Sequence, residues 1–208
     1  MAITLFVEKN WISPYVFACF VTLTEKKVPF EAKVLDTAKG ETKTPQYLAL
    51  TVTGRVPALD HDGFGIGESS AIVEYLEEAF PQPPVLPPAA RDRARLRQLS
   101  SWLRSDDTAL IRDERPTSTI FYQLTRPPLS QSAQAQADKL VAVAGRLLPP
   151  GQPYLFGDWS LADAELAFML QRLICGGDDV PGPLSTWATA QWQRPSIAAF
   201  VGHERPPR

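Results

Sequence analysis

The stretch ITLFVEKNWISPYVFACFVTLTEKKVPFEAKVL, residues 3–35, decides the fold of the first part of the chain. Residues 3–7 are β-branched, aromatic or aliphatic and predict a short buried strand. Ser13-Pro14 predicts a helix start, because serine caps free amides and proline suits the first helical position. That helix is predicted to end before Val28, and the alternating residues 30–35 predict a second strand. Strand, helix and strand at this spacing predict a parallel βαβ unit with a right-handed crossover.

The same kind of pattern continues to about residue 80. Residues 39–47 are polar and rich in threonine, which predicts a loop with a short irregular helix. Residues 56–60 predict a strand with a proline at its head, and residues 61–65 predict the turn of a hairpin. The apolar residues within 71–80 recur at helical spacing. The first 80 residues are therefore predicted to run β-α-β, loop, β-β-α.

Prolines divide the chain into two parts. The chain has 20 prolines, and their densest run, within residues 80–88, suits neither a helix nor a central strand. We therefore expect a domain at residues 1–80, a linker at 81–90 and a second domain at 91–208.

The second domain is predicted to be all-helical. Ser160 and Asp163 have the spacing of a capping box ahead of an apolar helix. Residues 204–208 are expected to form a loose tail. The segments with helical periodicity are 91–111, 133–148, 164–174, 184–190 and 195–201.

Composition excludes several classes of function. The 208 residues are 44% hydrophobic and 21% charged, with a net charge of −2, which disfavours nucleic acid and anionic membranes as partners. No apolar run has the length of a membrane span, and no secretory signal is visible at the N-terminus. The two cysteines and two histidines have neither disulfide-framework nor zinc spacing. We expect a cytoplasmic, metal-free protein.

Four short motifs, in this order along the chain, carry a family resemblance. Ser13-Pro14-Tyr15-Val16 resembles the Cys-Pro-Tyr-Cys site of glutaredoxins, with serine and valine in place of the two thiols. The segment 54–59, Gly-Arg-Val-Pro-Ala-Leu, resembles the one that introduces the cis-proline of the thioredoxin fold. Residues 67–76 resemble the Glu-Ser-x-Ala-Ile-x-x-Tyr-Leu signature of glutathione transferases, and residues 156–163 resemble the family's Gly-x-x-x-Ser/Thr-x-Ala-Asp segment.

Taken alone, each motif is more typical of a cap or a strand entry. Together they identify the chain as similar to the cytosolic glutathione S-transferases, of the bacterial type with an active-site serine. The resemblance spans nearly the whole chain. It implies a thioredoxin-like domain followed by an all-helical one.

The resemblance also implies the chemistry. Glutathione reacts as a thiolate, and an unperturbed thiol has a pKa of about 8.5. A hydroxyl donor and a helix N-terminus both favour the anion, so the resemblance makes Ser13 the catalytic group. Asn10, just ahead of it, is a second candidate donor to the thiolate.

Five further residues are implied to bind the tripeptide. The backbone of Val56, next to Pro57, would pair with the cysteine of glutathione as a strand pairs with a sheet edge. Glu68 would meet the γ-glutamyl ammonium, and Ser69 would bind the γ-glutamyl carboxylate at a helix N-terminus. Lys39 is the candidate for the glycine carboxylate, although a lysine in a polar loop is more often simply solvated.

The resemblance implies a small hydrophobic or electrophilic second substrate, and a homodimer. The reaction would be conjugation, in detoxification, or reduction of peroxides in oxidative stress. A segment Arg112-Asp113-Glu114-Arg115 is expected to be a solvated helix end, where one arginine could hold an anionic substrate. The residues considered for the electrophile pocket are Trp102, Asp106, Arg112, Phe121 and Tyr122, with Trp102 also suited to the core.

Two other classes of function stay open. One is a protein that keeps the fold without turnover and acts by binding another macromolecule. The other is a glutathione-linked reductase that uses Cys19, which requires this thiol to be exposed and acidic. The helical spacing of Cys19 predicts instead that it faces inward, as a small hydrophobe.

Overall fold

The computed structural model describes residues 2–148 and 151–207, and its contacts divide the chain into two compact units. The first unit contains the residues up to Val85 together with those from Ala198 onward, and the second contains Leu86–Ile197. The division lies within the predicted linker. The residues from Ala198 onward, which the sequence analysis assigns to the helical domain, make their contacts with the first unit.

A mixed four-stranded sheet forms the centre of the first unit, in the order β2-β1-β3-β4. β1 pairs with β2 in parallel and with β3 in antiparallel fashion, and β3 and β4 form the predicted hairpin. The predicted βαβ-ββα order of a thioredoxin-like domain is therefore confirmed. The strands are β1 (Ile3–Glu8), β2 (Glu31–Leu35), β3 (Ala58–His61) and β4 (Phe64–Gly67).

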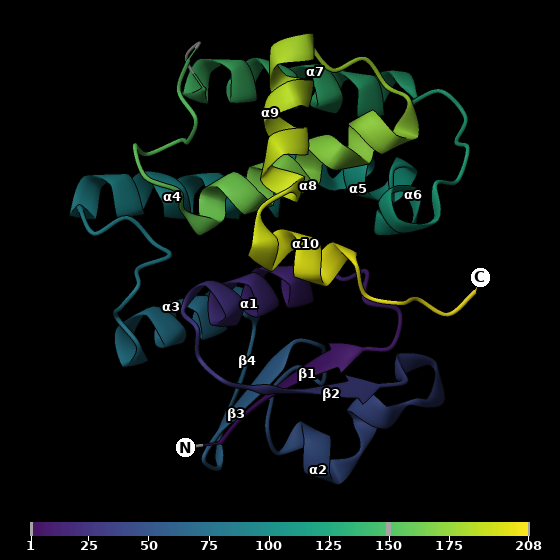
Figure 1. The fold of residues 1–208 in the computed structure, drawn as a ribbon. Coiled ribbons are helices and arrows are strands. Elements are labelled where there is room, and N and C mark those ends of the chain that lie inside the picture. The colour runs from purple at the N-terminus through teal and green to yellow at the C-terminus, as the bar shows by residue number, and fades with distance from the viewer. Residues whose placement is uncertain (1, 149–150, 208) are drawn as a thin grey trace. The chain divides into compact units, whose positions relative to one another are not determined.

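Helices cover both faces of this sheet (Figure 1). Leu5 and Val7 of β1 are fully buried. Between them Phe6 points to the opposite face, because side chains alternate along a strand, and its ring meets Tyr47 edge-on at 5.5 Å. The helices α1 (Pro14–Glu25) and α3 (Ser69–Ala79) lie on one face, and α2 (Pro45–Leu48) lies on the other with two short 3-10 turns, η1 (Thr37–Lys39) and η2 (Glu41–Lys43).

A buried ion pair binds the backbone after α3, near the end of the first unit. The Lys26 ammonium, just after α1, lies 2.6 Å from a carboxylate oxygen of Glu77 on α3. It also donates to the backbone carbonyls of Phe80 and Pro83, at 2.7 and 3.1 Å. The same Glu77 oxygen accepts the N–H of Val85 at 3.1 Å. The start of the proline-rich linker is thus held by side chains from two helices.

The second unit is helical throughout its described residues, with α8 at its centre, in contact with α4, α5, α6, α7 and α9 (Figure 1). The predicted cap of α8 is present: the Ser160 N–H donates to Asp163 Oδ2 at 2.8 Å. The helices are α4 (Ala90–Leu103), η3 (Asp106–Thr108), α5 (Ala109–Glu114), α6 (Thr117–Tyr122), α7 (Gln131–Leu147), α8 (Leu161–Gly176), α9 (Gly182–Trp192) and α10 (Pro195–Val201), which contains the division at Ala198.

Two features of this unit differ from the sequence prediction. The helix expected over 91–111 is broken, because Ser105 is extended and its hydroxyl accepts the Asp107 N–H, starting a new turn. Arg115, expected to be solvated, is 1% exposed and donates to both carboxylate oxygens of Asp178 at 2.6 Å. A charged sequence such as this cannot reveal a partner 63 residues away. In the described part of the chain, no helix is both long and apolar enough to span a membrane.

Candidate active site

Ser13 lies at the start of α1, at the end of the loop that follows β1. It is the N-cap of α1, with extended backbone angles, and Pro14 follows at the first helical position. The Ser13 hydroxyl oxygen accepts the N–H of Val16 at 3.3 Å. Since a hydroxyl that accepts an N–H keeps its own proton, the half-buried Ser13 can still donate one hydrogen bond outward. The N-terminus of α1 adds a partial positive charge at this point.

A buried glutamate supports the loop that leads to Ser13. Glu8, the last residue of β1, is 7% exposed. Its Oε1 accepts the N–H groups of Ile12 and Ser13, at 2.6 and 2.7 Å. Burial raises the pKa of Glu8, although these backbone N–H groups and the nearby Arg205 charge act to lower it. The sequence analysis missed Glu8, and a lone glutamate after a strand offers no signal for this role.

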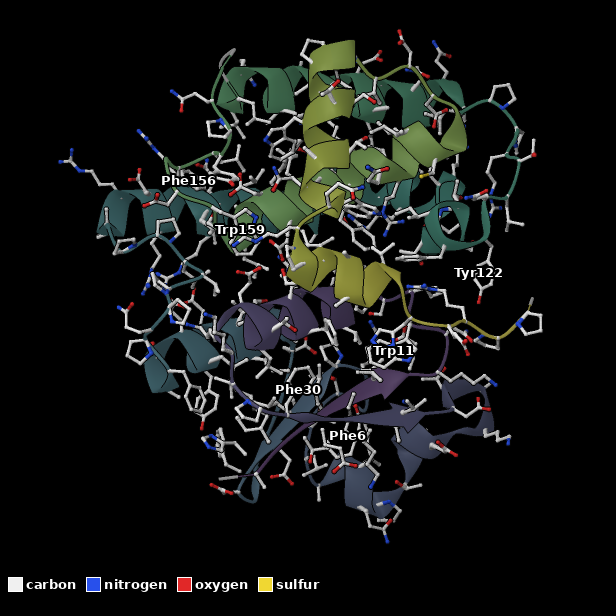
Figure 2. The ribbon with its side chains drawn as sticks, viewed as in Figure 1. Phe6, Trp11, Phe30, Tyr122, Phe156 and Trp159 are labelled. Carbon is white, nitrogen blue, oxygen red and sulfur yellow. The ribbon has the colours of Figure 1, made fainter. Side chains whose placement is uncertain are left out.

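The C-terminal segment holds the other side of the same loop. Arg205 donates to the carbonyl oxygen of Trp11 through Nε and Nη2, at 3.2 and 2.9 Å. The His203 ring stacks on the Trp11 ring, with centroids 3.7 Å apart and planes within 12°. Figure 2 shows Trp11 beside this segment. The tail predicted to be loose is therefore anchored at Arg205, and Arg208 lies outside the described residues.

Trp11 has a backbone conformation that needs such support. Its φ is 49°, in the left-handed region, which costs a residue with a side chain about 1–3 kcal/mol. Its ring is 7% exposed and meets Phe20 and Phe200 edge-on, both at 5.8 Å. The packed ring and the bonds of its peptide group together hold the loop in this conformation.

The Val56–Pro57 peptide bond is cis, as its motif predicts. Val56 precedes β3 and lies outside the sheet ladders. Among the described residues, neither the N–H nor the C=O of Val56 makes a hydrogen bond. The neighbouring carbonyl of Arg55 is held by the Tyr47 hydroxyl at 2.7 Å. This backbone can therefore pair with an extended peptide.

Glu68 and Ser69 start α3 as the motif predicts, but their side chains differ in exposure. Glu68 is exposed, has a φ of 67°, and accepts the Thr53 hydroxyl at 3.1 Å. Ser69 is 5% exposed and is the first residue of α3. Its backbone N–H belongs to the first turn, where amides lack partners within the helix and suit an anion.

The remaining two candidates lie in loops of the first unit. Lys39 ends η1 and its side chain is 77% exposed, 4.0 Å from Asp36 Oδ2. Asp36 is engaged more closely by Lys9, at 2.6 Å, which holds the pKa of Asp36 below its usual value. Lys39 is thus a nearly free cation, as expected of a solvated lysine and of an anion-binding one alike. Asn10 is half-buried in the loop between β1 and α1.

Cys19 does not meet the requirement of the reductase hypothesis. Its side chain is 0% exposed in the middle of α1, and its thiol lies 3.8 Å from the Ser69 carbonyl oxygen. Cys19 therefore packs as the small hydrophobe that its helical spacing predicts.

Two residues considered for the electrophile pocket have structural partners in the second unit. Arg112 donates to the carbonyls of Leu103 and Ser105, at 3.1 and 3.0 Å, and so closes the break between helices. Trp102 donates to Asp107 at 3.0 Å. Trp102 also lines a cavity of about 500 Å³ within this unit, between α4 and α7, together with Leu99 and other residues.

Comparison with known proteins gives the family. The model of the glutathione S-transferase N-terminal domain matches residues 12–79, and that of the C-terminal domain matches residues 89–204. The chain belongs to the glutathione S-transferase family. The resemblance to the glutathione S-transferase family, and the thioredoxin-like and all-helical fold that it implies, are therefore confirmed.

Three relatives illustrate the range of similarity. A solved structure of a glutathione transferase homolog from Burkholderia gl BGR1, with bound glutathione, is 37% identical, with a TM-score of 0.79 and 97% of each chain covered. Glutathione S-transferase hmp2 of Hypomyces subiculosus is 33% identical over 66% of this chain and 68% of its own length. Maleylacetoacetate isomerase of Dictyostelium discoideum is 37% identical over 46% of this chain. The match spans 45% of that isomerase, less than half its length.

Proposed function

We propose that this protein is a glutathione S-transferase of the serine type, in which Ser13 stabilises the thiolate of glutathione for attack on an electrophile. The observation that carries the proposal is the Ser13 hydroxyl at the N-terminus of α1, which accepts the Val16 N–H and keeps a proton to donate. The glutathione bound to the Burkholderia homolog supports glutathione as the cosubstrate.

The binding roles follow from the placement of the other candidates in the first unit. The N–H and C=O of Val56, beside Pro57, have no partner among the described residues and suit pairing with the cysteine of the tripeptide. The exposed Glu68 carboxylate suits the γ-glutamyl ammonium, and the first turn of α3 at Ser69 suits the γ-glutamyl carboxylate. Lys39 is proposed for the glycine carboxylate.

Thiolate activation needs only a modest free energy. A hydroxyl donor and a helix N-terminus that lower the pKa of the thiol by about 2 contribute roughly 2.7 kcal/mol of thiolate stabilisation. The thiol proton leaves to solvent, and the sulfur then forms a bond to the electrophilic carbon as the leaving group departs. With a peroxide, the sulfur attacks the O–O bond to give a sulfenic acid and an alcohol. A second glutathione then converts the sulfenic acid to the disulfide and water.

The family resemblance further supports a cytoplasmic homodimer of bacterial origin. Size measurement in solution by light scattering tests the dimer, and a monomer would refute that part of the proposal. Parallel assays with a chromogenic aryl chloride and with an organic hydroperoxide measure which reaction the enzyme favours.

The decisive experiment compares wild-type protein with Ser13→Ala and the matched control Ser101→Ala, an exposed serine of α4. Calorimetry measures glutathione affinity, and ultraviolet absorbance against pH measures the pKa of the bound thiol. We expect all three proteins to bind glutathione and only Ser13→Ala to lose the lowered pKa.

Two other outcomes have definite meanings. If the thiol pKa in Ser13→Ala equals that in the wild type, Asn10 or backbone amides activate the thiol and the role of Ser13 is refuted. If the wild-type protein does not bind glutathione, the enzyme proposal fails, and a protein that acts by binding another macromolecule becomes the better account.

A further inference from the structure

One peptide group in the loop before Ser13 is held at both ends by side chains of opposite charge. Its carbonyl oxygen, that of Trp11, accepts two hydrogen bonds from Arg205, at 3.2 and 2.9 Å. Its N–H, that of Ile12, donates to Glu8 Oε1 at 2.6 Å. A carboxylate and a guanidinium thus fix the plane of this peptide from opposite sides.

The guanidinium is itself fixed before it reaches the loop. Its Nη1 donates to the carbonyls of Val201 and His203, both at 2.7 Å, and its Nη2 donates to that of Phe200 at 3.1 Å. A planar fork with several donors can make all these bonds at once, whereas a lysine ammonium cannot reproduce them. Arg205 therefore links the backbone of the C-terminal segment to the Trp11 carbonyl through hydrogen bonds.

The Glu8 oxygen that accepts the Ile12 N–H also accepts a hydrogen bond from Ser13. Glu8 Oε1 accepts the Ser13 N–H at 2.7 Å. Its second oxygen, Oε2, is buried and has no hydrogen-bond partner among the residues that the structure describes. Burial of a carboxylate costs free energy that its hydrogen bonds must offset. Of the two N–H groups that Oε1 accepts, one belongs to Ile12 and the other to Ser13, the residue proposed to activate the thiol.

The conformation being held is a strained one. Trp11 has a φ of 49°, which residues other than glycine adopt only where their surroundings require it. A change of this φ, which is a rotation about the N–Cα bond of Trp11, would turn the Trp11 carbonyl and the Ile12 N–H away from Arg205 and Glu8 and would break those bonds. It would also move Ser13, which follows directly.

We propose that Glu8 and Arg205 are positioning residues, which hold the Trp11–Ile12 peptide so that the Ser13 hydroxyl stays aimed at the thiol of glutathione. The inference rests on the proposed function of Ser13. It adds that the C-terminal segment, through Arg205, helps to position the Ser13 hydroxyl. Neither the Glu8 nor the Arg205 side chain is proposed to touch the sulfur.

The signs of the two charges separate positioning from direct electrostatics. Through space, removal of the Arg205 cation would raise the pKa of the bound thiol, and removal of the Glu8 anion would lower it. Loss of positioning raises that pKa in both cases, because the Ser13 hydrogen bond to the thiolate weakens. Glu8→Gln is therefore the deciding variant.

The experiment measures the pKa of the glutathione thiol bound to Glu8→Gln and Arg205→Gln by ultraviolet absorbance against pH. The matched controls are Glu31→Gln and Arg91→Gln, both exposed. We expect the pKa to rise by about 1 in each loop variant, a tenfold loss of thiolate at pH well below that pKa, and to stay unchanged in the controls. Glutathione affinity at a pH where the thiol is neutral should change less than about threefold, because the groups proposed to bind its two ends are intact.

A lowered or unchanged pKa in Glu8→Gln overturns the proposal. If Glu8→Gln does not fold, a chain that ends at Glu204 tests the same point from the other side, and an unchanged thiol pKa there overturns it.

Backbone amide exchange separates failure of this inference from failure of the proposed function. If wild-type protein binds no glutathione, the proposed function fails by itself. Faster exchange at Ile12 and Ser13 in Arg205→Gln than in Arg91→Gln still supports a held peptide, and equal exchange refutes it.

Discussion

The buried pair of Lys26 and Glu77 makes a sharp prediction about stability. Their side chains are 0% and 4% exposed and their charged atoms lie 2.6 Å apart. We consider Lys26→Met, which keeps the unbranched stem of the side chain, one atom shorter, and removes the ammonium. The change leaves a buried carboxylate without its counter-charge, and two backbone carbonyls lose the donor that Lys26 supplies.

The expected magnitude follows from these contacts. Breaking a buried ion pair by removing one partner costs about 3–5 kcal/mol. For a chain of this size, each kcal/mol lowers Tm by roughly 2–4 °C, so we expect Tm to fall by about 6–20 °C. The loss should exceed what charge alone explains, since the ammonium also holds the linker. The carbonyls of Phe80 and Pro83 are both within its reach.

Urea unfolding followed by circular dichroism gives the free energy of unfolding directly. The matched control is Lys27→Met, the same change at the next residue, whose side chain is exposed. We expect this control to change stability by less than about 0.5 kcal/mol. A loss below about 1 kcal/mol in Lys26→Met, or equal losses in both variants, would refute the reasoning from burial.

Two further predictions concern the surroundings of the site. Gly67→Ala should lose about 1–3 kcal/mol of unfolding free energy in urea, because its Cβ would overlap the hydroxyl of the buried Thr51. Gly145→Ala, which meets open space in α7, should instead gain about 0.5–1 kcal/mol, and a loss there would contradict the prediction. Burial, and then the Arg205 charge, lower the pKa of His203 from 6.5, so its stabilising contribution is present above 6.5 and is lost as pH falls through the lowered pKa. Proton NMR titration measures that pKa, and an upward shift would show the sign to be wrong.

Much of the fold was predictable because its signals are local. The βαβ-ββα order, the start of α1 at Pro14 and the Asp163 cap of α8 all follow from residues within a few positions of one another. Where the prediction of one continuous helix over 91–111 failed, a competing local bond was responsible. Ser105 caps a new turn and so breaks a helix that hydrophobic periodicity alone predicts to be continuous.

The residues of the candidate site likewise divide into those that local motifs predict and those that only the fold brings together. The sequence alone predicted Ser13, Val56–Pro57 and Glu68–Ser69 as site residues, since each belongs to a short motif. It also indicated that Cys19 faces inward, and the structure buries it. The order of the four motifs was sufficient to identify the family. The motifs, like the two matched domains, extend over most of the chain.

Only the tertiary structure decided how the Ser13 loop is held. Arg205 and Trp11 are 194 residues apart, and nothing near either one marks the other as a partner. Glu8 likewise has no distinguishing neighbours in the sequence. It gains its proposed role only because folding buries its carboxylate within reach of the N–H groups of Ile12 and Ser13. Local propensity depends on neighbours along the chain, whereas a buried charge takes its partners from whatever the fold packs against it.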